Sequence, residues 1–300
     1  MRFILVAVCV LATAYVALRF VPGAAPLDDD LFPGRHPLVI AHRGGMGLWP
    51  EHTLYAFRSA LAAGTDVLEM DVRRSADGQL VVFHDADLDR TTDGEGSLSA
   101  WNRSDLALLD AGYRFSADGG RTFPYRGRGL RIPTLEEVFR ELPGARMSVE
   151  IKEEAEDVAH ALCALVETHG VVDRVLVSSF HQAPIDAFRA RCPSVATAAT
   201  PGEAFRFTLA SVLGLPNLVQ PRGAALHMFE SLGPYRLVTP RFVSHAAALN
   251  LPIYVWGVND AEAIRRLIDA GVSGITADRP DQVLALLGRL RGAPEAAPAP

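Results

Sequence analysis

Short apolar segments that end on ionisable residues recur along this 300-residue chain. The segment 38–41 runs into His42, the segment 80–83 runs into His84, and the segment 274–276 is followed closely by Asp278. Patterns typical of helices separate these segments, and strands that alternate with helices indicate a parallel sheet. In a closed parallel barrel the carboxyl ends of the strands form one rim, where active sites lie. The chain is therefore predicted to be an α/β protein, a (β/α)8 TIM barrel with its functional residues on that rim.

The barrel is predicted to occupy residues 36–291. That length is close to the usual size of such a barrel, about 250 residues. An open, doubly wound sheet is the alternative fold, but no G-x-G-x-x-G motif follows the first strand. The absence of this motif favours the barrel.

A long Gly-rich segment, at about 86–131, interrupts the alternation directly after His84. It is too long for a simple connection and is predicted to be an insertion after an early strand. Because it follows His84, it is expected at the rim. Its aromatic residues and arginines suit a lid or a binder of the alcohol part of a substrate, and they equally suit a packed excursion with arginines on its surface.

Apolar periodicity and capping residues place the other elements. Helices are expected at 53–64, 134–142, 155–169, 184–191, 201–213, 240–249, 260–270 and 280–290. Strands are expected at 38–43, at two positions within 67–85, and at 148–152, 174–178, 195–199, 224–229, 253–255 and 274–276. The region 215–239 is the hardest to interpret, and 224–229 is its best strand candidate.

An uninterrupted apolar run extends from Phe3 to Leu18, between Arg2 and Arg19. A membrane span needs about 20 residues, and a basic residue at its end can extend the span by snorkelling. Segment 1–22 is therefore a signal peptide or a membrane anchor, and the poor cleavage site after it favours the anchor. Residues 23–35 are predicted to be a linker and residues 292–300 a disordered tail.

The expected location is a membrane, through this N-terminal segment. We expect anchoring in the inner membrane with the catalytic domain outside the cytoplasm, or secretion if the segment is cleaved, although one Arg on each flank hardly fixes the orientation. Cys9, Cys163 and Cys192 are isolated in the sequence and are expected to be separate buried thiols. The cysteines thus neither indicate nor exclude an oxidising compartment.

Two acidic residues share one face of a predicted strand. Glu69 and Asp71 are two positions apart, and strand side chains alternate between faces. Burying such a pair without a counter-charge costs roughly several kcal/mol, and a hard cation removes the conflict. With Glu150 as a third oxygen ligand, we expect one divalent cation, Mg²⁺ or Ca²⁺. The alternative is a solvated strand end with a salt bridge to Arg73 or Arg74.

Histidines and basic residues occupy other strand ends. His42 and His84 suit an acid–base pair, in which one takes a proton from a nucleophile and the other protonates a leaving group. Arg43 and Lys152, the only lysine in the chain, add positive charge, and together with a cation they suit a phosphate diester. The formal net charge of −6 gives no support for nucleic-acid binding.

Several motifs in order along the chain resemble the glycerophosphodiester phosphodiesterase family. They are H-R-G-G at 42–45, P-E-H-T at 50–53, L-E-M-D-V at 68–72, F-H-D at 83–85, R-T-T-D-G at 90–94, I-P-T-L-E-E-V at 132–138, V-E-I-K at 149–152, W-G-V-N at 256–259 and G-I-T-A-D-R-P at 274–280. The resemblance covers nearly the whole globular part of the chain.

This resemblance implies a β/α barrel that cleaves glycerophosphodiesters to glycerol 3-phosphate and an alcohol with a divalent cation. It assigns His42 and His84 to acid–base catalysis and Glu69, Asp71 and Glu150 to the cation. It also implies that Arg43 and Lys152 hold the phosphate, that Glu51 supports the site and that Trp256 lines the pocket.

The chain departs from the family pattern at a few positions. His52 stands where the family usually has Asn, and Gly257 where it usually has Thr; near the C-terminus the chain has T-A-D-R-P in place of I-T-D-R-P. His52 is expected either to crowd the cation or to change the preferred ion. Because a membrane anchor makes lipid-derived substrates plausible, lysophospholipase D activity on lysolipids is an alternative function, and a non-catalytic barrel that binds phosphorylated ligands at the membrane is another.

Overall fold

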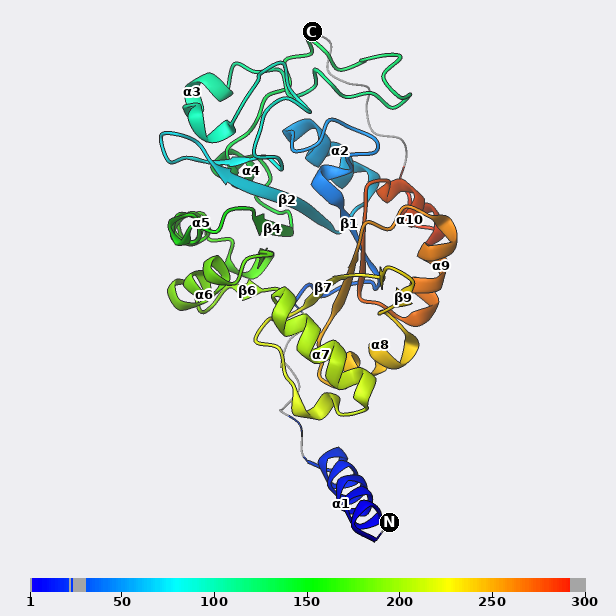
Figure 1. Ribbon diagram of the computed structural model, residues 1–300. Coiled ribbons are helices and arrows are strands. Elements are labelled where there is room, and N and C mark those ends of the chain that lie inside the picture. The colour runs from blue at the N-terminus through cyan, green and yellow to red at the C-terminus, as the bar shows by residue number, and fades with distance from the viewer. Residues whose placement is uncertain (1, 22, 24–30, 292–300) are drawn as a thin grey trace.

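The computed structural model describes residues 2–21, 23 and 31–291 (Figure 1). The predicted linker is therefore only partly described, and the predicted tail at 292–300 lies outside the described residues.

A closed barrel of parallel strands forms the centre of the molecule, as predicted. Its strands are β1 (Leu38–Ala41), β2 (Val67–Arg74), β4 (Met147–Ile151), β5 (Val175–Ser178), β6 (Ala196–Thr197), β7 (Leu226–Phe229), β10 (Ile253–Trp256) and β11 (Gly274–Ala277). They are hydrogen-bonded in the order β6-β5-β4-β2-β1-β11-β10-β7. A parallel bridge between Ala198 and Ala225 joins the two ends of this order. The barrel closes there because Gly223 has no side chain: a Cβ at Gly223 would lie 2.2 Å from the amide nitrogen of Ala199.

Helices form a ring around the strands (Figure 1). They are α2 (Leu54–Ala63), α4 (Leu135–Glu141), α5 (Glu156–Thr168), α6 (Gln182–Arg191), α7 (Pro201–Leu213), α8 (Pro240–Ala247), α9 (Ala261–Ala270) and α10 (Pro280–Leu286). Their ends follow the predicted signals. Thr53 accepts a hydrogen bond from the amide of Ala56 to cap α2, and Thr134 and Glu137 form a capping box at the start of α4.

Strand alternation divides the core into an inside and an outside. Leu38 and Ile40 of β1 and Val67 of β2 pack in one buried cluster within the barrel. Leu68 and Met70 of β2 pack in the larger cluster between strands and helices. Because neighbouring side chains on a strand face opposite sides, Glu69 and Asp71 face the same side as Val67, toward the barrel interior.

The long segment after β3 (Leu80–Val82) is an insertion with its own small core. β2 and β3 are the two strands expected within 67–85, and they pair antiparallel. The insertion contains a 3₁₀ turn, η2 (Leu98–Ala100), and α3 (Arg103–Leu106). Leu88, Leu98 and Leu106 pack against Val81 of β3. The insertion lies beside α2 and β2 at one side of the barrel, which Figure 1 shows at the top.

A small hairpin in the region 215–239 was not expected from the sequence. β8 (Ser231–Leu232) pairs antiparallel with β9 (Tyr235–Arg236) directly after β7. Its strands are too short for an alternating pattern, so the turn at Gly233, where φ is +57°, is its main local signal. Leu232 and Tyr235 are exposed.

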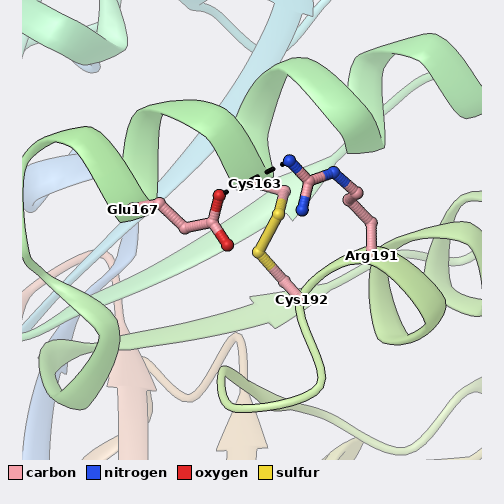
Figure 2. Close-up of a disulfide and its surroundings, with 4 residues drawn as sticks. All are labelled: Cys163, Glu167, Arg191 and Cys192. Atoms are coloured by element: carbon pink, nitrogen blue, oxygen red, sulfur yellow. Dashed lines mark ion pairs between the residues drawn. A yellow bond between two sulfur atoms is a disulfide. The ribbon is translucent and has the colours of Figure 1, made fainter.

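Cys163 and Cys192 form a disulfide, which corrects the expectation of separate thiols (Figure 2). Their Cα atoms are 5.8 Å apart, although 29 residues separate them in the sequence. The bond links α5 to the end of α6, beside an ion pair between Glu167 and Arg191. Sequence spacing does not reveal that these two helices are neighbours, so the pairing could not be predicted.

The N-terminal apolar run forms one helix, α1 (Arg2–Arg19), as expected. Among the described residues it is the one helix that is long and apolar enough to cross a membrane, and a signal sequence would meet the same criterion. None of its residues is buried.

Candidate active site

Three buried carboxylates from two neighbouring strands meet at the barrel rim. Glu69 and Asp71 lie on β2 and Glu150 lies on β4, where Asp71 and Glu150 are direct neighbours in the sheet. One oxygen of each lies within 4.8 Å of the others, and each residue is at most 2% exposed. Oδ2 of Asp71 is buried without a hydrogen-bond partner. Oxygen donors at this spacing fit a hard divalent cation.

Burial and mutual repulsion oppose ionisation of this cluster. Burial, and then the charge of Asp71, raise the pKa of Glu150 to about 7. The same two causes raise the pKa of Glu69 well above its ordinary value. Without a cation, burial and repulsion therefore shift Glu69 and Glu150 toward their protonated forms, and a bound cation would oppose that shift.

Two basic side chains border the carboxylates. The amide of Arg43 donates to Oε2 of Glu69 at 2.8 Å, and its guanidinium Nε lies 3.6 Å from Oδ2 of Asp71. Arg43 adopts a left-handed conformation, with φ of +50°, in the turn after β1. Nζ of Lys152 lies 2.9 Å from Oε1 of Glu150 and 3.6 Å from Oδ1 of Asp71. Both basic side chains thus lie at the edge of the predicted site for the divalent cation.

Each predicted catalytic histidine is held by a carboxylate at Nδ1. Nδ1 of His42 lies 2.5 Å from Oδ1 of Asp278, and its Nε2 lies 3.9 Å from Oε2 of Glu69. Nδ1 of His84 lies 2.5 Å from Oδ1 of Asp85. A carboxylate at Nδ1 fixes the ring orientation and leaves Nε2 for other contacts. Burial lowers the pKa of His84, although the charge of Asp71 opposes this effect.

Sequence reasoning missed the residues that orient the histidines. Asn259 donates to Oδ2 of Asp278 at 2.7 Å and accepts from the Asp278 amide. Arg90 of the insertion donates to Asp85 and, through two nitrogens, to Glu51. The sequence signal that could have identified these two acidic residues is their position just after a strand: Asp278 follows β11, and Asp85 follows His84 shortly after β3.

Glu51 and His52 support the carboxylates from the loop before α2. Glu51 accepts from Arg90 and, at 3.0 Å, from Arg43. Nε2 of His52 accepts from the buried amide of Asp71 at 2.9 Å, so this nitrogen does not donate to Oδ2 of Asp71, 3.2 Å away. The backbone of His52 has φ of +60°, a conformation that Asn tolerates better than most residues.

Trp256 forms a wall beside the site at the end of β10. Its ring centroid lies 6.5 Å from that of His42 and 5.3 Å from that of Phe180. The indole lines a cavity of about 260 Å³ that has Glu150 on its wall. His227 packs on Trp256 at 4.5 Å, and burial lowers the pKa of His227 to about 3, so His227 is neutral. All nine site residues expected from the sequence thus lie at or beside the same rim.

The sequence is similar to one protein family over most of its length. Residues 42–282 match the model of the Glycerophosphoryl diester phosphodiesterase family. A glycerophosphodiester phosphodiesterase of Caldanaerobacter subterraneus subsp. tengcongensis is 33% identical over 258 residues, which cover 83% of this chain and 97% of the relative.

Solved structures give the same result. A glycerophosphodiester phosphodiesterase from Agrobacterium tumefaciens is 28% identical with a TM-score of 0.65, over 83% of this chain and 99% of its own. An Oleispira antarctica phosphodiesterase in complex with the product sn-glycerol-3-phosphate is 27% identical with a TM-score of 0.68, over 84% and 97% of the two chains.

The raised pKa of Glu150 predicts how stability depends on pH. Because this pKa is higher in the folded chain than in the unfolded chain, the proton on Glu150 contributes stability that is lost as the pH rises through about 7. With a chelator present, we expect the free energy of unfolding to fall by about 1 to 2 kcal/mol between pH 6 and pH 8. Urea unfolding at both pH values measures the change.

A saturating divalent cation should abolish this loss, and Glu150→Gln in the chelated protein should remove the part that Glu150 contributes. An equal pH dependence with chelator and with cation would contradict the assignment of these carboxylates to a cation site.

Proposed function

This chain belongs to the glycerophosphoryl diester phosphodiesterase family and is a phosphoric diester hydrolase, and from that premise we propose that it cleaves glycerophosphodiesters to glycerol 3-phosphate and an alcohol. The observation that carries this proposal is the convergence of three buried carboxylates and two oriented histidines on one rim. The relative whose structure holds sn-glycerol-3-phosphate supports the same product.

In this proposal Glu69, Asp71 and Glu150 hold one divalent cation, Mg²⁺ or Ca²⁺. The unpartnered Oδ2 of Asp71 and the raised pKa of Glu150 support this donor set. When bound, the cation supplies a Lewis acid that withdraws electron density from phosphate oxygens. His52 accepts from the amide of Asp71 and so positions that carboxylate from behind.

Arg43 and Lys152 bind the phosphate. Both lie within 4 Å of the carboxylates, where their positive charge favours an anionic substrate and the added charge of its transition state. Glu51 fixes the guanidinium of Arg43 through a hydrogen bond of 3.0 Å. Trp256 bounds the space beside His42 and so lines the pocket for the organic part of the substrate.

His42 and His84 share the proton transfers. Asp278 and Asp85 each hold an Nδ1–H, so that the Nε2 atoms handle the protons that move during hydrolysis. One imidazole takes a proton from the attacking hydroxyl, and the other gives a proton to the oxygen of the leaving alcohol. Because Arg90 joins Asp85 to Glu51, the insertion fixes His84 and Arg43 together.

Replacement of His42 tests this mechanism. We expect His42→Ala to lower kcat for glycerophosphocholine by about 10² to 10⁴, because one proton transfer loses its catalyst, with a smaller change in KM. Asp278→Asn should lower kcat by a smaller factor, since it disturbs only the orientation of the ring. Steady-state assays of choline release give both numbers.

His160→Ala is the matched control, because His160 is an exposed histidine on α5. Activity of His42→Ala within a few-fold of that of the natural protein would show that the catalyst has been misplaced.

We propose further that α1 anchors the protein in the inner membrane with the barrel outside the cytoplasm. The disulfide between Cys163 and Cys192 supports this location, since such bonds persist in oxidising compartments and are rare in the cytosol. Cleavage of α1 would instead release a secreted enzyme of the same fold.

The disulfide makes the proposed location testable. It closes a loop of 29 residues, so we expect its removal in Cys163→Ala/Cys192→Ala to lower the free energy of unfolding by about 3 to 4 kcal/mol. Urea unfolding measures the loss, and Cys9→Ala, outside the barrel, should show none. Protein taken from membranes with both barrel thiols free and full stability would contradict the location.

A further inference from the structure

An apolar cavity extends the candidate active site away from the cation ligands. It has a volume of about 260 Å³ and lies between the ends of β5, β6, β7 and β10. Glu150 lies on its wall, while Phe180, Met228, Phe229 and Trp256 form much of the remainder. Glycerol and choline offer little hydrocarbon to such a lining. The lining therefore fits a substrate that carries more apolar surface.

The far side of the cavity opens to solvent between α7 and the β8–β9 hairpin. Phe205 of α7 and Leu232 of β8 line it there, and they are 68% and 70% exposed. Exposed large apolar side chains at the mouth of a pocket are unusual for a site that takes only small polar molecules. A chain of methylene groups that leaves the cavity would cover both of them.

An apolar stripe continues from this mouth along α7. Phe205, Leu209, Val212 and Leu213 follow helical spacing and are each at least 48% exposed. Outside the N-terminal segment, nine of the eleven exposed large apolar side chains in the described part of the chain lie between residues 180 and 235. The exposed apolar surface of the barrel is thus concentrated around the cavity mouth and α7.

The stripe ends at the candidate membrane span. The hydroxyl of Tyr15 in α1 donates to the carbonyl of Leu213 at 2.7 Å, and the side chain of Asn217 donates to the carbonyl of Leu18 at 3.1 Å. Figure 1 shows α7 at the side of the barrel that faces α1. If α1 lies in a bilayer, the stripe on α7 therefore lies close to the lipid surface.

We propose that the substrates of this site are phosphodiesters that carry a single hydrocarbon chain, as lysophospholipids do, and that the chain lies in the cavity beside Trp256. A volume of about 260 Å³ is near the lower end for ligand pockets and suits one chain better than two. The inference rests on the proposed function and names its substrate class.

The reaction on such a substrate is the same hydrolysis. For lysophosphatidylcholine, the bond between phosphorus and the choline oxygen breaks, the hydroxyl of water joins phosphorus, and the remaining proton joins the choline oxygen. The products are lysophosphatidic acid and choline. A diester whose chain is on the alcohol instead gives glycerol 3-phosphate and the chain-bearing alcohol.

The test compares substrates with and without a hydrocarbon chain. Full-length protein in phosphatidylglycerol nanodiscs is assayed with glycerophosphocholine, with hexanoyl and octanoyl lysophosphatidylcholine, and with glycerophospho-octanol. The chain is on the glycerol in the lysophosphatidylcholines and on the alcohol in glycerophospho-octanol. For at least one of these two positions, we expect kcat/KM to rise about three- to fourfold per buried methylene, mainly through KM. The position that shows the rise identifies where the natural substrate carries its chain.

Phe205→Ser and Leu232→Ser test the place of the chain. Because both side chains are largely exposed, these variants should fold, and each should lower kcat/KM for the octanoyl substrate at least fivefold more than for glycerophosphocholine. Leu108→Ser is the matched control, because Leu108 is 76% exposed on the insertion and does not line the cavity. Its replacement should leave unchanged the ratio of kcat/KM for the octanoyl substrate to kcat/KM for glycerophosphocholine.

Hydrolysis of glycerophosphocholine without any gain from a chain would overturn this inference and leave the proposed function intact. A gain that both cavity variants preserve would overturn the placement of the chain in the cavity. Failure to hydrolyse any of the substrates would overturn the proposed function and this inference with it.

Discussion

The mutual repulsion of Glu69, Asp71 and Glu150 is the constraint around which the rim is arranged. Their oxygens lie within 4.8 Å of one another, and each of the three residues is at most 2% exposed. Charges in such a place need partners, because burial removes their solvation and also strengthens their mutual repulsion. Arg43 and Lys152 supply part of the compensation, and the raised pKa values of Glu69 and Glu150 show that they do not supply all of it. A divalent cation would complete the balance.

The barrel creates this cluster through register and alternation. Asp71 and Glu150 are paired across β2 and β4, and every second residue of each strand faces the interior. The two histidines come from the loops after β1 and β3. Asp278, after β11, orients His42, and Asp85, next in the chain, orients His84. Residues that lie far apart in the sequence therefore act on one substrate because each follows a strand that ends at the same rim.

The local features were predictable, whereas contacts between distant segments were not. Strand alternation alone placed Glu69 and Asp71 on one face, a capping box gave the bounds of α4 to within one residue, and the predicted bounds of α7 match those in the structure. By contrast, the partnership of His42 with Asp278 joins opposite ends of the barrel sequence, and no local pattern encodes it. The same reason explains why the disulfide was missed: α5 and α6 pack together only in the folded barrel. The short β8–β9 hairpin had too few residues for any periodic signal.

Direct titration of the cation is the measurement that tests the central claim. Calorimetric titration of Mg²⁺ or Ca²⁺ into chelator-stripped, full-length protein at neutral pH should give one ion per chain, with protons released as the carboxylates ionise. Asp71→Asn should weaken this binding at least tenfold, because it removes the charge at the centre of the cluster. Absence of binding, or binding that Asp71→Asn leaves unchanged, would contradict a rim organised around a single cation.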